Sequence, residues 1–120
     1  MGHTIRLNNA LKGYTYDQDK IMSPQETVAR FKATTARLNL DILSQTRRID
    51  NGRLDIPVFF SECGSDAIDV IGTRKQMGKG GTPEQSEASA VMELAERFSF
   101  FSYVKNERNF TVSTPKKLGK

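Results

Sequence analysis

The stretch TPEQSEASAVMELAERFSFFSYV, residues 82–104, decides the fold. It opens with Thr82 and Pro83, and a threonine N-cap before a proline at the first helical position is a common helix start. No further proline or glycine follows for about six helical turns. We therefore expect one long helix from Pro83 to about Val104.

The two sides of this helix differ in polarity. At about 100° per residue, Ser89, Glu93 and Glu96 fall within a sector of roughly 60°. Arg97 lies at its edge. The opposite side is apolar and is the expected core face, made by Val91, Leu94, Ala95, Phe98 and Phe101. We expect the polar stripe to line a cleft or an exposed groove.

A second helix start precedes this one. Ser23, Pro24 and Glu26 have the spacing of a capping box, so a helix is expected from Pro24 to about Leu38. Its apolar face is expected to contain Val28, Phe31, Thr35 and Leu38.

The sequence between the helices is typical of strands. Residues 42–49 and 54–62 flank Asp50-Asn51-Gly52, and Asn-Gly is a strong hairpin signal. Residues 67–71, after the turn 63–66, are expected to form a third strand. The predicted fold is α+β, with an antiparallel hairpin and a third strand covering the apolar faces of both helices. Residues 112–120 are polar and are expected to form a flexible tail.

Composition narrows the class of protein. The 120 residues suit one domain, and 37% of them are hydrophobic and 27% charged. No apolar run approaches the roughly 20 residues of a membrane span, and the N-terminus lacks a hydrophobic signal core. With Cys63 the only cysteine and His3 the only histidine, an internal disulfide and a Cys/His zinc site are excluded. We expect a cytoplasmic protein without membrane contacts.

The net charge of +4 raises the question of nucleic acid. Basic residues are spread along the chain, and their small clusters lack the interleaved aromatic residues that stack on bases. We expect no nucleic-acid partner. The cations serve either as an ordinary solvated surface or as contacts for a phosphate-bearing small ligand.

The basic glycine-rich segment GTRKQMGKGG, residues 72–81, is not a P-loop. Five residues separate Gly72 from Gly78, and Gly80 rather than Ser or Thr follows Lys79. Two interpretations remain. The segment is either a flexible connection, or an anion site in which Lys79 acts with the N-terminus of the following helix.

The acidic stripe also has two interpretations. Carboxylates at i and i+3, such as Glu93 and Glu96, can share one hard cation such as magnesium, with Ser89 donating to a phosphate. Alternatively, they form the solvated face of an amphipathic helix.

A family resemblance favours the first interpretation. Gly78-Lys79-Gly80 followed by Ser89-Ala90 … Glu93 … Glu96-Arg97 resembles the signature of the YcaO family, a GKG loop and then a helix reading S-A-x-x-E-x-x-E-R. Lys20, followed seven residues later by Thr27, is similar to the nucleotide-contacting residues of the family's N-terminal stretch. Ile56-Pro57-Val58 matches its short strand. The similarity covers about residues 18–105.

The resemblance implies an ATP- and Mg²⁺-dependent enzyme. YcaO members phosphorylate the oxygen of a peptide amide after a nucleophile has added, which yields azolines or thioamides. Carried over by position, Glu93 and Glu96 are metal ligands and Ser89 is a nucleotide or magnesium contact. Lys20 and Thr27 are further nucleotide contacts. Some members have a lysine where this chain has Glu84, so Lys79 or Arg97 is expected to supply the phosphate-facing charge.

The family's domain is several times longer than this chain. Residues 1–120 are therefore expected to be an N-terminal segment, one incomplete half of a larger YcaO-type domain that is inactive alone. Its expected partners are a peptide or protein substrate and a second chain that carries the rest of the domain. Uncovered apolar surface is expected to cause self-association. The alternative is a non-catalytic module, keeping half of the fold, that binds a partner or peptide.

Overall fold

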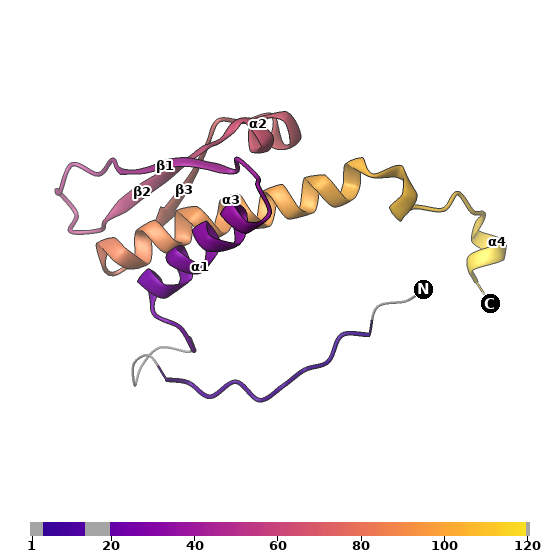
Figure 1. The fold of residues 1–120 in the computed structure, drawn as a ribbon, viewed down its shortest axis with the longest axis horizontal. Helices are drawn as coiled ribbons and strands as arrows, with labels where there is room; N and C mark the ends of the chain where they lie inside the picture. The colour runs from indigo at the N-terminus through magenta and orange to yellow at the C-terminus, as the bar shows by residue number, and fades with distance from the viewer. Residues whose placement is uncertain (1–3, 14–19, 120) are drawn as a thin grey trace.

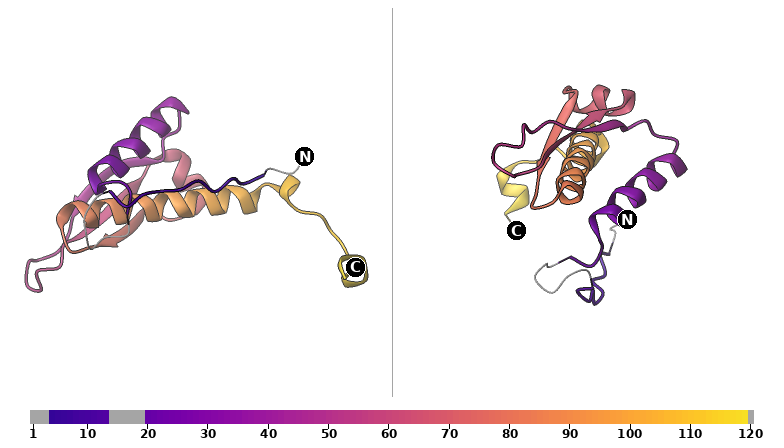
Figure 2. Two further views of the ribbon diagram at one scale, coloured as in Figure 1. Left: turned by 90° about the horizontal axis from the view of Figure 1, so that it is seen from below. Right: turned by 90° about the vertical axis from the view of Figure 1, so that its left-hand side faces the viewer.

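The computed structural model describes residues 4–13 and 20–119, so His3 and Lys120 lie outside the described residues. A long helix, α3 (Pro83–Lys105), runs through the centre (Figures 1 and 2). An antiparallel sheet of order β1-β2-β3 lies on it, formed by β1 (Leu43–Arg48), β2 (Val58–Cys63) and β3 (Lys75–Lys79). Around these lie α1 (Pro24–Arg37), α2 (Ser65–Ile71), the 3-10 turn η1 (Glu107–Asn109) and α4 (Pro115–Leu118). The α+β class is confirmed.

Both helix starts form as the sequence predicts. In α1 the Ser23 hydroxyl accepts from the Glu26 N–H at 3.2 Å, and the Glu26 carboxylate accepts from the Ser23 N–H at 2.9 Å. In α3 the Thr82 hydroxyl accepts from the Gln85 N–H at 3.2 Å. These bonds satisfy amide groups that the first turn of a helix leaves free.

The core lies between α3, β2 and α2. Its buried centre consists of Ile42, Cys63, Ala67 and Leu94. Two buried hydroxyls join α3 to β2 and to the residue before it. Ser61 Oγ donates to Ala90 O and Ser86 Oγ donates to Pro57 O, each at 2.7 Å. Because both polar groups are paired, their burial carries no penalty for an unmade bond.

The predicted third strand is wrong. Residues 67–71 belong to helix α2, and the third strand is β3, inside the glycine-rich segment. Gly72 ends α2 at φ +79°, a left-handed C-cap that glycine adopts without strain. Asp41 secures the other end, since its carboxylate accepts from the Ser65 N–H at 2.9 Å. That bond crosses 24 residues of sequence, so local patterns could not reveal it.

The hairpin joins β1 and β2 as expected, but through a longer connection. Strand β2 begins at Val58 rather than Leu54. Asp55 has φ +49°, a conformation that interrupts an extended strand. Asp50 closes the connection, because its carboxylate accepts from the Val58 N–H at 3.0 Å.

The expectation that the strands cover both helices equally is not met, because α3 carries most of the contacts with the sheet, whereas α1 packs mainly on α3. On the predicted apolar faces, Val91 and Leu94 are buried, Phe98 and Phe101 are half-buried, and Leu38 is exposed. Phe98 and Phe101 are only half-buried because α3 continues past the end of the sheet (Figure 1).

Within residues 4–13 and 20–119, no helix combines the length and apolar character of a membrane span.

Candidate functional site

The glycines of the GKG sequence let β3 approach α3 closely. A Cβ on Gly78 would lie 2.6 Å from Ser86 O and 2.7 Å from the backbone carbon of Ser89, closer than real side chains come. Among the described glycines only Gly52 and Gly72 have positive φ, so Gly78 and Gly80 serve packing rather than unusual backbone angles. The interpretation of the whole segment 72–81 as a flexible connection is wrong because residues 75–79 form strand β3, although Gly72 does have the positive φ expected of a connecting glycine.

This close approach places Lys79 beside the start of α3. In β3 exposed and buried residues alternate, and Lys79 is exposed next to buried Gly78. The chain then turns through Gly81, whose N–H donates to the Gln85 carboxamide at 3.0 Å. Gln85 thus holds the entry to the helix and leaves Lys79 at its N-terminal end.

Four of the predicted nucleotide contacts meet in one cavity of about 400 Å³, named here the basic pocket. Lys20 precedes α1, Thr27 lies on α1, Lys79 ends β3 and Ser89 lies on α3. The lining is completed by Met22, Pro24, Gly80, Gln85, Ala88 and Met92. The Thr27 hydroxyl donates to Ser23 O at 3.0 Å, so its oxygen remains an acceptor.

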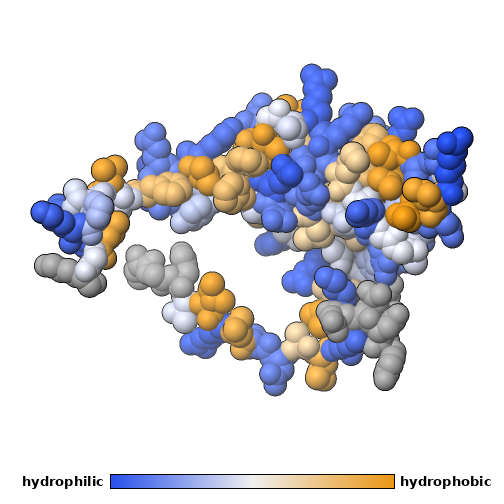
Figure 3. Space-filling model, turned by 180° about the vertical axis from the view of Figure 1, so that it is seen from behind, coloured by the Kyte–Doolittle hydropathy of each residue, from blue (hydrophilic) through white to orange (hydrophobic). Residues whose placement is uncertain are grey.

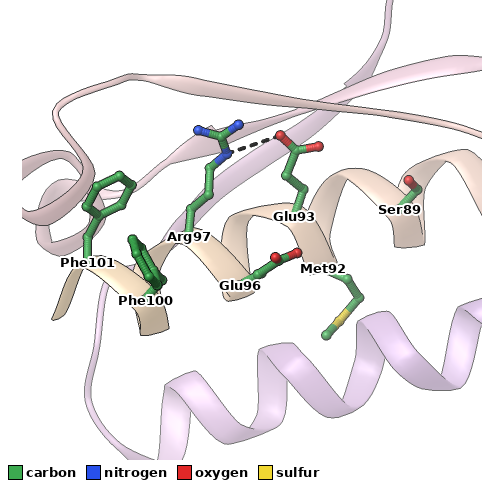
Figure 4. A pocket seen from close by; sticks show the side chains of 7 residues that line it. All are labelled: Ser89, Met92, Glu93, Glu96, Arg97, Phe100 and Phe101. Atoms are coloured by element: carbon green, nitrogen blue, oxygen red, sulfur yellow. Dashed lines mark hydrogen bonds and ion pairs between the residues drawn. The ribbon is translucent and has the colours of Figure 1, made fainter. Parts of the chain in front are cut away.

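A second cavity of about 610 Å³, the acidic pocket, continues along the same face of α3 (Figure 4). Its polar lining comprises Ser89, Glu93, Glu96 and Arg97, and its apolar lining comprises Met92, Phe100 and Phe101. Arg97 Nε donates to Glu93 Oε1 at 3.1 Å. Figure 4 shows the Glu96 side chain directed toward Met92, away from this ion pair.

Ser89 and Met92 line both pockets, so the two adjoin along α3 and are together named here the α3 groove. Its basic end carries the ammonium groups of Lys20 and Lys79, and its acidic end carries the carboxylates of Glu93 and Glu96. An elongated ligand with phosphates and a hard cation matches this separation of charge.

The groove supplies few metal ligands by itself. In the part of the chain that the structure describes, no three His, Cys, Asp or Glu side chains gather as a metal-binding group. Glu93 and Glu96 offer hard carboxylate oxygens, the ligand type that magnesium prefers, and phosphate oxygens and water would complete its six positions.

Sequence reasoning missed several residues that line the groove, among them Met92, Phe100 and Phe101. Met92 joins the two pockets, and its position three residues after Ser89 and four before Glu96 is the helical spacing that could have revealed it. Phe101 was assigned to the core but lines the acidic pocket. Cys63 takes no part: it is buried, and burial raises the pKa of its thiol, which keeps it protonated and a poor nucleophile.

The chain matches the model of the family described as YcaO cyclodehydratase, ATP- and Mg²⁺-binding, over residues 77–120. This region is less than half of the chain, and within it the similarity is YcaO-like and supports a general ATP-dependent, cyclodehydratase-type role. It contains Lys79, Ser89, Glu93, Glu96 and Arg97, whereas Lys20 and Thr27 lie outside it. Neither the search of curated proteins nor the search of solved structures finds a match.

Proposed function

We propose that this chain is the N-terminal part of an ATP- and magnesium-dependent enzyme of the YcaO type, and that the α3 groove holds its nucleotide. The observation that carries the proposal is that predicted nucleotide contacts from separate segments meet in one pocket. Lys20 and Thr27 come from the start of α1 and Lys79 from the end of β3, yet they line one pocket with Ser89 of α3. That pocket shares Ser89 and Met92 with the pocket lined by Glu93 and Glu96.

The basic end suits the phosphates. Two ammonium groups attract them, and the N-terminus of α3 adds a positive partial charge beside Lys79. Ser89, at the junction of the pockets, has a hydroxyl that can donate to a phosphate oxygen. Because Lys20 and Lys79 are exposed, water and salt screen the attraction, and we expect weak binding by the isolated chain.

The acidic end suits the metal. Glu93 and Glu96 lie one turn apart on the same pocket, so their carboxylates can reach one cation that also meets the phosphates. When bound, magnesium–ATP would supply the phosphoryl group and neutralise the charge that builds on it. We propose that the acceptor is the oxygen of a peptide amide, leading to an azoline or a thioamide.

This chain alone is not expected to turn over peptide. The groove provides groups for nucleotide and metal, but phosphoryl transfer also requires the acceptor to be held in line with the terminal phosphate. We propose that a further segment or a second chain holds the peptide. Such a protein works in the cytoplasm, where ATP is available.

Nucleotide titration of the ¹⁵N-labelled chain tests the proposal. With magnesium and ATP, we expect amide signals of Lys79, Gly80 and Ser89 to shift. Glu93→Gln and Glu96→Gln should each remove most of the magnesium-dependent part of these signal shifts. Each substitution removes one carboxylate charge and nearly keeps the shape of the side chain. Glu107→Gln, in η1 outside the groove, is the matched control. If both groove variants bind as the wild type does, the two glutamates are only a solvated helix face.

A second candidate, a non-catalytic module that binds a partner or peptide, is favoured by exposed apolar surface. On α3 beyond the sheet, Phe100 and Tyr103 are 60% and 56% exposed. Hydrophobic side chains also gather along this part of α3 in the space-filling view (Figure 3). Surfaces of this kind mark sites for a partner, whereas an incomplete half of a domain would self-associate through the same surface. Sedimentation over a concentration series separates the two candidates: a compact monomer favours the module, and reversible oligomers that Phe100→Ser weakens favour the incomplete half.

A further inference from the structure

One ion pair lies inside the acidic pocket. Arg97 Nε donates to Glu93 Oε1 at 3.1 Å across one helical turn, and both side chains line the cavity. Glu96, on the same wall, makes no ion pair with the described residues. Without a ligand, therefore, one of the two proposed metal ligands is already shared with a cation of the protein itself (Figure 4).

We propose that Arg97 competes with the metal for Glu93, so that the groove takes up its metal together with a nucleotide and not before it. This inference rests on the proposed function, and it assigns Arg97 a positioning role there. A divalent ion alone meets one free carboxylate, Glu96, and a single carboxylate holds magnesium poorly because the ion surrenders its water shell reluctantly.

The pair is suited to exchange. The Arg97 and Glu93 side chains are 47% and 39% exposed, so water competes for both and the bond is weak. Only Nε donates to the carboxylate, which leaves the terminal nitrogens of the guanidinium available. A phosphate offers the planar guanidinium a two-point contact stronger than the one it gives up.

The exchange of partners therefore favours metal binding only after phosphates have entered the groove. When phosphates enter the groove, Arg97 gains an alternative anion, and Glu93 is released to face the cation that arrives with them. Arg97 suppresses binding of metal alone and supports binding of the metal–nucleotide complex. A residue with only a structural role would change both affinities in the same sense.

The test measures both affinities in the full chain and in Arg97→Gln, which keeps a polar, partly aliphatic side chain and removes the charge. Free Mn²⁺, a paramagnetic probe for hard-cation sites, is titrated while broadening of the Glu93 and Glu96 amide signals is followed. We expect Arg97→Gln to bind Mn²⁺ alone roughly two- to fivefold more tightly, the scale of an exposed pair one turn apart. The same variant should bind magnesium–ATP roughly three- to tenfold more weakly.

Two controls accompany the variant. Arg108→Gln removes an arginine of η1 outside both pockets and should change neither affinity. Amide spectra of Arg97→Gln outside the groove should overlay those of the wild type, which shows that the fold is kept.

An unchanged or lower Mn²⁺ affinity in Arg97→Gln overturns the inference, even if magnesium–ATP still binds in the groove. If neither Mn²⁺ nor magnesium–ATP perturbs the groove in either protein, the proposed function fails with it. Opposite changes of the two affinities support both.

Discussion

At the acidic end of the α3 groove, Glu93, Glu96 and Arg97 all belong to one helix, whereas the basic end is assembled from three separate segments. Lys20 and Thr27 come with the start of α1, and Lys79 comes from the end of β3. The acidic end therefore needs only the helix, while the basic end needs the packing of α1 and β3 on α3.

This difference has a consequence for stability and binding. Local helical spacing holds neighbouring side chains even when distant packing loosens. Groups from different segments keep their positions only while those segments stay packed. Disturbing the tertiary contacts should therefore disperse the phosphate-binding residues before it disperses the carboxylates.

The largest expected effect comes from Gly78→Val. The added side chain would meet the backbone of α3 at Ser86 and Ser89, which cannot give way as a flexible side chain can. We expect a loss of about 3 kcal/mol or more in the free energy of unfolding. Denaturant unfolding measures the loss, and nucleotide titration should show the Lys79 signals no longer responding to ATP.

Gly81→Ala is the matched control for that change. A Cβ there would lie 3.2 Å from the flexible end of the Gln85 side chain, and Gly81 does not have positive φ. We expect stability within about 1 kcal/mol of the wild type. Equal losses in the two variants would show that the β3–α3 approach is not what requires glycine.

The second prediction separates the two ends of the groove by their ligands. Lys79→Ala should weaken ATP binding about tenfold whether or not magnesium is present, because it removes a charge from the phosphates. Glu93→Gln should weaken binding only when magnesium is present. Isothermal titration with and without EDTA makes the comparison, and Lys32→Ala, on the exposed side of α1, is the control.

The accuracy of the sequence-based predictions also differs between features set by local spacing and features set by contacts between distant segments. The periodicity of α3 identified its polar stripe, and the caps of α1 and α3 were confirmed to the residue at their starts. All of these signals act within one or two helical turns, where sequence spacing and spatial distance correspond.

The errors arose where distant residues decide. Residues 67–71 are helical because Asp41 and Gly72 cap them, and the Asp41 bonds come from a segment far away in the sequence. The segment 72–81 was interpreted as a possible flexible connection, whereas α3 packs against Gly78 and Gly80. The roles of the seven predicted site residues stay predictions, although the structure brings all seven to one groove.

A smaller effect is expected from the cap of α1. Ser23→Ala removes the acceptor for the Glu26 N–H and should cost about 1 kcal/mol, lowering Tm by roughly 4–8 °C. Because α1 carries Thr27 into the basic pocket, ATP-induced shifts should shrink there, while Mn²⁺ broadening at Glu96 should not change. Ser23→Asp, which also caps, should restore both stability and shifts. Failure of this rescue would mean that the cap does not position α1.

The smallest effect concerns acid, and it involves carboxylates outside the groove. Asp50 accepts from Arg48 at 2.8 and 3.0 Å and from the Val58 N–H at 3.0 Å, contacts that hold the pKa of its carboxyl well below the usual range. The bonds from Ser65 lower the pKa of Asp41 in the same direction. A carboxyl whose pKa is lower in the folded chain contributes stability above its unfolded pKa, near 3.9, and loses that contribution as the pH falls toward the folded value. We therefore expect Tm to decline as the pH is lowered below about 4 and to vary little between pH 5 and 7 from this cause.

Asp50→Asn should lower Tm at neutral pH and make the decline shallower, since the amide does not titrate. Because Asp50 closes the β1–β2 connection and lies far along the chain from α3, the variant should leave ATP binding at pH 7 unchanged; an equally steep decline in Asp50→Asn would assign the acid sensitivity to other carboxylates.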